Sequence, residues 1–202
     1  MNSSRPGLVY LHGFNSSPKS QKVSELRALL PRLCPEIELL VPELGFDPAR
    51  AYQRARRALA SLQGRPAGVI GSSLGGYYAA ALSEETGVNA ALINPAVYPY
   101  RLLQDYLGPQ HNPYTDERYE LTRDHMAALL ALDPGKLRYP ERLLVLLQSG
   151  DETLDYREAL ARFPDSPTWL QAGGDHRFQQ FDRVVPAILA FLYARPNTPP
   201  PG

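Results

Sequence analysis

The stretch that most constrains this chain is the motif Gly71-Ser72-Ser73-Leu74-Gly75, which fits the pattern G-x-S-x-G. A short apolar run typical of a buried strand, Val69-Ile70, precedes the motif, and the helix-forming segment 77–82 follows it. A strand that turns into a helix within so few residues leaves one side chain at the apex, and crowding there requires glycine or very small neighbours. The motif therefore predicts a sharp turn that exposes Ser73 in front of the positive end of a helix. The alternative is a glycine-rich turn that binds a phosphate or only permits close packing.

Composition limits the partners that the chain can have. Its 202 residues suit one domain with a full-sized core, and 21 Lys and Arg balance 21 Asp and Glu. A net charge of zero gives no electrostatic reason to expect nucleic acid or an acidic membrane surface as a partner. The single cysteine, Cys34, excludes internal disulfides and cysteine-rich metal sites. Residues 1–6 lack the apolar core of a signal peptide, and no apolar run approaches about 18 residues, so we expect a soluble cytoplasmic protein without a membrane span.

Apolar runs and helical patterns alternate along the chain. Such alternation predicts a three-layer, doubly wound, mostly parallel sheet, with the chemistry at the carboxyl ends of its strands. We expect one domain over residues 1–194 and a disordered, proline-rich tail over 195–202. Pro18 and Pro48 stand at the expected first positions of two helices, after the capping residues Ser17 and Asp47. The predicted strands are 7–11, 37–41, 69–70, 90–93, 143–147 and 168–171, and the predicted helices are 18–33, 48–62, the one that follows the motif to about 86, and 180–193.

About fifty residues, 94–142, separate two of the predicted strands, which is too long for one crossover. The segment is rich in tyrosine and proline, and helical patches are expected over 100–107 and 121–132. A long insertion at the catalytic edge that carries amphipathic rings is what a substrate-covering cap would look like. The alternative is an elaborated surface connection without a role in substrate binding.

A serine hydroxyl becomes a nucleophile only when a base takes its proton and an acid orients that base. Asp151 follows the predicted strand 143–147 by a few residues, and His176 follows the last predicted strand in a loop with two glycines. The order Ser73, Asp151, His176 is the one that α/β-hydrolases use, so these residues are the predicted catalytic triad and this fold is expected. Glu152 and Asp155 lie within a short loop of Asp151 and remain alternatives for the acid.

Acyl transfer also needs donors for the oxyanion, and we expect them to be the backbone N–H groups of Phe14 and Leu74.

Two further histidines, His111 and His125, lie in the inserted segment, where surface or packing roles are expected. His12 is expected to anchor the loop that follows the first strand. Apolar and aromatic residues near the motif could build an acyl pocket for small or medium chains, or could be core beneath the helix. The proposed pocket residues are Phe14, Tyr77, Tyr98 and Tyr106.

Several longer segments resemble one family. They are Tyr10-Leu-His-Gly-Phe-Asn-Ser-Ser-Pro18, Gly71-Ser-Ser-Leu-Gly-Gly-Tyr-Tyr78, Asn94-Pro-Ala96, Asp105-Tyr-Leu-Gly108, Asn112-Pro-Tyr114 and Gly150-Asp-Glu-Thr-Leu-Asp-Tyr156. Together they resemble the YqiA/YcfP family of small bacterial esterases, over about residues 8–192. The resemblance implies a compact α/β-hydrolase with esterase activity and maps the nucleophile, acid and base onto Ser73, Asp151 and His176. The segment Gly173-Gly-Asp-His-Arg-Phe178 departs from the expected Gly-Gly-Asn-His-Ala-Phe but keeps the base.

The predicted function is therefore that of a serine esterase that uses neither a metal nor a cofactor. The expected partner is a small acyl ester or thioester, and a monomer or weak homo-oligomer is expected. An acyl-CoA thioesterase with the same triad is the first alternative. A non-catalytic binding protein that uses the tyrosine-rich segment is the second.

Overall fold

The computed structural model describes residues 5–194 and contains a six-stranded parallel sheet with the order β2-β1-β3-β4-β7-β8. The predicted tail 195–202 lies outside the described residues. A second, two-stranded antiparallel sheet pairs β5 with β6. The strands of the large sheet are β1 (Gly7–Leu11), β2 (Glu38–Leu40), β3 (Ala67–Ser72), β4 (Asn89–Ile93), β7 (Leu143–Gln148) and β8 (Thr168–Gln171).

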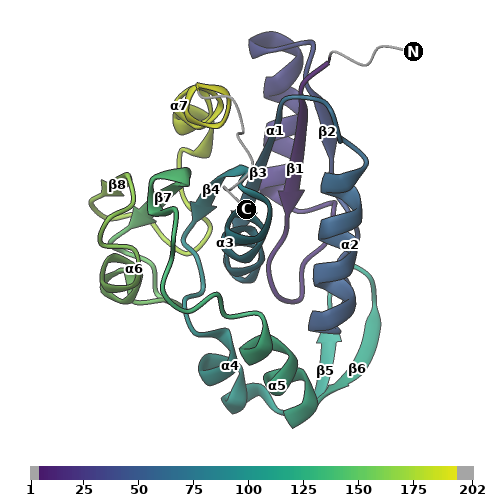
Figure 1. Ribbon diagram of the computed structural model, residues 1–202. Coiled ribbons are helices and arrows are strands. Elements are labelled where there is room, and N and C mark those ends of the chain that lie inside the picture. The colour runs from purple at the N-terminus through teal and green to yellow at the C-terminus, as the bar shows by residue number, and fades with distance from the viewer. Residues whose placement is uncertain (1–4, 195–202) are drawn as a thin grey trace.

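Helices cover both faces of this sheet, which makes the predicted three layers (Figure 1). Helices α1 (Gln21–Leu33) and α7 (Phe181–Tyr193) pack on one face against Leu8, Tyr10 and Ile70. The other face carries α2 (Pro48–Ala60), α3 (Leu74–Thr86) and α6 (Tyr156–Arg162), which cover Val9, Val69 and other alternate strand residues. Successive side chains of a strand point to opposite faces, so each strand contributes to both halves of the core.

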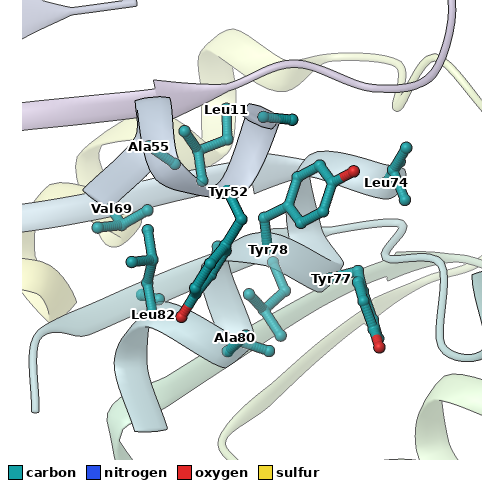
Figure 2. Packing of buried hydrophobic residues seen from close by; sticks show 14 of the residues in the cluster. Leu11, Tyr52, Ala55, Val69, Leu74, Tyr77, Tyr78, Ala80 and Leu82 are labelled. Carbon is teal, nitrogen blue, oxygen red and sulfur yellow. The ribbon is translucent and has the colours of Figure 1, made fainter. Parts of the chain in front are cut away.

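The helix that follows the motif, α3, lies at the centre of the molecule and is buried over most of its length. Tyr77 and Tyr78 belong to the hydrophobic cluster on this face, together with Tyr52 and Leu82 (Figure 2). Close packing of α3 depends on the two glycines of the motif. A Cβ on Gly75 would collide with the backbone carbonyl of Leu11, and a Cβ on Gly71 would collide with the backbone of Gly75. Since both neighbours are backbone, neither can move aside cheaply.

Replacing Gly75 with alanine is therefore expected to lower the free energy of unfolding by about 1–3 kcal/mol or more, the usual cost of overpacking a core. Urea denaturation would measure this loss. A Gly64→Asn variant is the matched control, because Gly64 has open space around it and asparagine tolerates its positive φ of 79°. Equal stability of the Gly75→Ala protein and the wild type would contradict the packing described.

The ends of the predicted helices are mostly confirmed. The side chain of Asp47 caps α2 by accepting from Arg50 N–H, and Gly87 ends α3 in the left-handed conformation. The start of α1 was predicted wrongly, since the helix begins at Gln21 with Ser20 as its capping residue. The Ser17 side chain instead accepts from Lys19 N–H in a local turn, so Ser17 and Pro18 precede the helix.

The inserted segment 94–142 folds differently from the expectation. Where a helix was expected over 100–107, the short α4 (Pro99–Leu102) continues as the 3₁₀ helix η1 (Leu103–Tyr106). The hairpin β5 (Gly108–Asn112) and β6 (Glu117–Leu121) was not predicted. Helix α6, which lies after the insertion, was not predicted either. Helix α5 (Arg123–Ala131) confirms the second helical patch, and the 3₁₀ helix η2 (Pro140–Arg142) leads into β7. Met126 and Leu129 of α5 join the core, so part of the insertion is integral to the domain.

No helix within residues 5–194 combines the length and the apolar character that crossing a bilayer requires.

Candidate active site

Ser73 occupies the apex of the turn between β3 and α3 with φ 55° and ψ −121°. A positive φ is strained for a residue with a side chain and persists only where the surroundings hold it. Here the Ser73 N–H donates to Ile93 O at 3.0 Å, and Ser73 O accepts from Gly76 N at 2.9 Å and from Ala96 N at 3.1 Å. The residues that follow β4 therefore help to hold the strained turn.

His176 and Asp151 form a direct pair. The Nδ1 atom of His176 lies 2.9 Å from Asp151 Oδ2 and 3.0 Å from Oδ1. The Asp151 side chain is only 2% exposed, whereas that of His176 is 25% exposed. A hydrogen bond from Nδ1–H to the buried carboxylate leaves Nε2 as the basic nitrogen of the ring. The arrangement is that of a base held by an orienting acid.

Asp151 is kept ionised by its neighbours. Burial alone would raise the pKa of its carboxyl, but hydrogen bonds from His176 and from the backbone N–H groups of Leu154 and Thr153 outweigh burial, and the pKa lies below its ordinary value. Both N–H groups donate to Oδ1 at 2.8 Å. Hydrogen bonds to the charged form stabilise it, so Asp151 is a carboxylate at neutral pH.

The other acids in these two loops have different contacts. Glu152 accepts from the backbone N–H of His176 at 3.0 Å, and Asp155 caps α6 by accepting from Arg157 N–H. Asp175 accepts from Arg177 N–H and from the Gln179 side chain. Among these carboxylates only Asp151 contacts the imidazole of His176 in the described structure.

Two buried amide side chains position the loop that carries His176, and sequence reasoning missed both. The Asn94 side chain donates to the carbonyls of Asp175 and His176 and accepts from Gln148 N–H. Gln148, which is fully buried, accepts from Asp175 N–H and Gln179 N–H and donates to Gln179 O. The sequence does contain a clue to both residues. Asn94 directly follows β4 and Gln148 ends β7, so each is a polar residue at the end of an apolar run.

The loop after β1 lies against Ser73 on the other side. A Cβ on Gly13 would come within 3.2 Å of Ser73 Cβ, so the loop backbone passes directly beside the serine. Within residues 5–194, neither Phe14 N–H nor Leu74 N–H has a hydrogen-bond partner. Three side-chain bonds fix the loop to the hairpin: Tyr119 Oη donates to Asn15, Asn15 donates to Gln110, and Asn112 donates to Ser16 O.

His12 anchors this loop, as expected. Its Nε2 accepts from Leu44 N–H at 3.2 Å, and its Nδ1 lies 3.1 Å from Gly13 O. Burial lowers the pKa of His12 to about 4, and the hydrogen bond to Gly13 opposes this only in part. The imidazole is therefore neutral at physiological pH and links the loop after β1 to the loop after β2. The two remaining histidines lie in the insertion: His111 contacts Asp116 at 2.7 Å, and His125 accepts from Thr122 N–H.

The pKa of His12 predicts a dependence of stability on pH. The unfolded histidine binds its proton below about pH 6.5 but the folded one only below about pH 4, so stability is complete above 6.5 and is lost as the pH falls toward 4. The full loss is about 3 kcal/mol for a shift of this size. Urea denaturation at several pH values should show a flatter dependence for His12→Gln, whose amide oxygen can still accept from Leu44. Equal slopes for the two proteins would contradict this assignment.

Ser73 and His176 line one cavity of about 320 Å³. Phe14 and Tyr114 are its aromatic lining residues besides Tyr10. Of the proposed pocket residues, Phe14 lines this cavity, whereas Tyr77, Tyr98 and Tyr106 do not. Tyr77 donates to Leu129 O from the core, and Tyr98 packs against Tyr100. Tyr106 is 48% exposed and its ring stands edge-on to that of Phe14 at 6.3 Å.

Solved structures with the same fold come from distant proteins. One is a protein from Agrobacterium vitis S4 (TM-score 0.73, 22% identity, 93% of this chain and 88% of that chain). Others are Est1E from Butyrivibrio proteoclasticus (0.66, 15%, 94% and 87%) and alpha/beta hydrolase domain-containing protein 10 from mouse (0.65, 16%, 91% and 87%). These similarities show that the fold is that of the α/β-hydrolases.

Residues 7–193 match the family described as "Uncharacterised protein family (UPF0227)". The match covers nearly the whole of the described chain, including the turn at Ser73 and the loops that carry Asp151 and His176. The resemblance of its motifs is thereby confirmed, and the chain belongs to UPF0227, the YqiA/YcfP family.

Proposed function

We propose that the protein is a serine hydrolase that cleaves carboxylic esters through Ser73, His176 and Asp151. The observation that carries this proposal is the pairing of His176 Nδ1 with the buried Asp151 carboxylate, on a loop that lines the same cavity as Ser73. A histidine oriented in this way presents Nε2 as a base. The strained turn presents the serine hydroxyl, which needs such a base to become a nucleophile.

In the proposed reaction, Ser73 Oγ attacks the ester carbonyl while His176 Nε2 takes the hydroxyl proton. Asp151 holds the imidazole in one tautomer and stabilises its protonated form. Collapse of the tetrahedral intermediate expels the alcohol, which receives the proton from His176, and leaves an acyl group on Ser73. Water, deprotonated by the same histidine, then attacks the acyl-enzyme and releases the acid and the free serine.

The oxyanion donors in this mechanism are the N–H groups of Phe14 and Leu74. Both are unpaired in the described part of the chain and flank Ser73, one from the loop after β1 and one from the start of α3. Donors that are fixed before the reaction stabilise the developing charge without reorganising. The strong attachment of the loop after β1 to the hairpin and to His12 supports this role.

Solved structures of similar fold support the proposal of a serine hydrolase. Est1E has been solved with ferulic acid bound, and another relative in fold is described as an alpha-beta serine hydrolase homologue from Coxiella burnetii. A cavity of about 320 Å³ lies at the lower end of the range for ligand pockets. We therefore expect short or medium acyl groups to be preferred.

A fluorophosphonate probe and a series of p-nitrophenyl esters, from acetate to palmitate, test the proposal. We expect one probe per chain on Ser73 by peptide mapping, and turnover that falls for the longest acyl chains. An acyl-CoA measured beside the ester of the same acid distinguishes the thioesterase alternative. Absence of both labelling and turnover would support the binding-protein alternative instead.

A further inference from the structure

A lysine side chain lines the cavity that holds Ser73 and His176. Lys22 is the second residue of α1, and it reaches the cavity together with Ser20 and Gln21 from the start of that helix. The residue is half-buried, and its side-chain ammonium forms no hydrogen bond or ion pair with any of residues 5–194. A half-buried lysine that lines a cavity without a direct partner is uncommon, because lysines that are shielded from water are usually paired.

Several charged side chains lie around Lys22, but none of those in the described residues contacts its ammonium directly. Burial lowers the pKa of its ammonium, while the more distant carboxylates of Glu25, Asp175 and Asp151 oppose that effect and Arg177 adds to it. Removing a cation from water costs free energy that only a close anion or good hydrogen bonds can offset. The site is thus arranged to gain from an anion placed next to the ammonium.

The rest of the lining favours the same kind of ligand. Arg177 is a second cation in the wall, and none of the residues that line the cavity is an aspartate or a glutamate. The carboxylate of the proposed triad, Asp151, lies behind His176 and is 2% exposed, so it does not present its charge to the cavity. The wall also contains neutral polar residues, among them Asn15, Ser16, Ser20 and Gln21.

We propose that the ester substrate carries an anionic group, in its acid or its alcohol part, and that Lys22 binds this group and sets the specificity of the site. The inference rests on the proposed function, because it places the anion in the cavity of Ser73. It adds a substrate class, anionic esters, and a residue that selects it. An ammonium acts on such a group as a point charge, which suits either a carboxylate or a phosphate.

A competing role for Lys22 would be purely electrostatic, balancing Asp151 and Asp175 from a distance. That role would alter the basicity of His176, and so would change the turnover of all esters by the same factor. Recognition of an anionic group instead changes the preference between a charged ester and its neutral counterpart. The preference, expressed as a ratio of kcat/KM values, separates the two roles.

Two matched pairs of esters make the test. p-Nitrophenyl hemiglutarate against p-nitrophenyl pentanoate places the carboxylate in the acid part, and 4-carboxyphenyl pentanoate against phenyl pentanoate places it in the alcohol part. For at least one pair, Lys22→Gln should lower the ratio of charged to neutral kcat/KM by about tenfold to a hundredfold, as expected for loss of one hydrogen bond to a charged group. The loss should appear mainly in KM, and Lys22→Arg should restore part of it.

Lys19→Gln is the matched control, because Lys19 is an exposed lysine three residues earlier and does not line the cavity. It removes the same charge and should leave both ratios within about twofold, as expected for an exposed charge. Unchanged ratios in Lys22→Gln, or equal ratios in Lys22→Gln and Lys19→Gln, would overturn the inference while the hydrolysis of neutral esters stands. Absence of turnover and of fluorophosphonate labelling in the wild type would overturn the proposed function and this inference together.

Discussion

Replacing Ser73 with alanine is expected to reduce kcat for p-nitrophenyl butyrate by at least about 10⁴-fold, because no other group can form the acyl-enzyme. The oxyanion donors and the binding cavity would remain, so a small rate above that of water should persist. Initial rates at saturating ester measure the effect, and the variant should also lose its fluorophosphonate label. The substitution removes only the hydroxyl group of a half-buried side chain, so the melting temperature should stay close to that of the wild type.

Ser72 is the appropriate comparison, because it is the neighbouring serine at the end of β3. It is buried beside Tyr10, whereas Ser73 has the positive φ that places a side chain at the apex. Ser72→Ala should therefore keep the label on Ser73. Retention of activity in Ser73→Ala together with its loss in Ser72→Ala would show that the nucleophile had been assigned to the wrong serine.

Replacing Asp151 with asparagine is expected to lower kcat by about 10³- to 10⁴-fold. The amide keeps the size of the side chain but cannot hold Nδ1–H of His176 with a negative charge, so Nε2 no longer remains the basic nitrogen. Fluorophosphonate labelling of Ser73 should slow by a similar factor, since the same base activates the serine. Rates of ester hydrolysis and of labelling measure the two effects independently.

Asp155→Asn makes the same chemical change four residues later. Asp155 caps α6 and does not contact His176, and asparagine is an equally good capping residue. This control should retain its activity and its stability. A large loss of activity in Asp155→Asn with little loss in Asp151→Asn would assign the acid to the second carboxylate.

The parts of the fold that sequence could predict are those fixed by local chemistry. The motif around Ser73 imposes its turn because only glycine fits at 71 and 75, and Asp47-Pro48 starts α2 by a side-chain cap and a preset φ. Ser73, Asp151 and His176 each follow a predicted strand. Because these strands are parallel, their carboxyl ends lie at one edge of the sheet, and the three residues could be expected there. These inferences needed no knowledge of distant contacts.

What sequence could not predict depends on contacts between residues far apart in the chain. The hairpin β5–β6 has mostly polar strands without apolar alternation, and it is held by hydrogen bonds to the loop after β1 and by Leu121, which joins the core. Asn94 and Gln148 become positioning residues only because β4 and β7 are neighbours. Lys22 follows the pattern of an ordinary solvated helix residue, and only the packing of α1 beside the cavity gives it another environment.

The bonds that fix the loop after β1 join residues 95, 96 and 104 positions apart. The loop that carries Phe14 is synthesised before the hairpin, so its attachments form only after the hairpin has been translated. His176 follows later still, about 100 residues after Ser73. In the proposed mechanism, a nascent chain thus carries its nucleophile long before it has a base, and it cannot hydrolyse esters until the loop after β8 has left the ribosome.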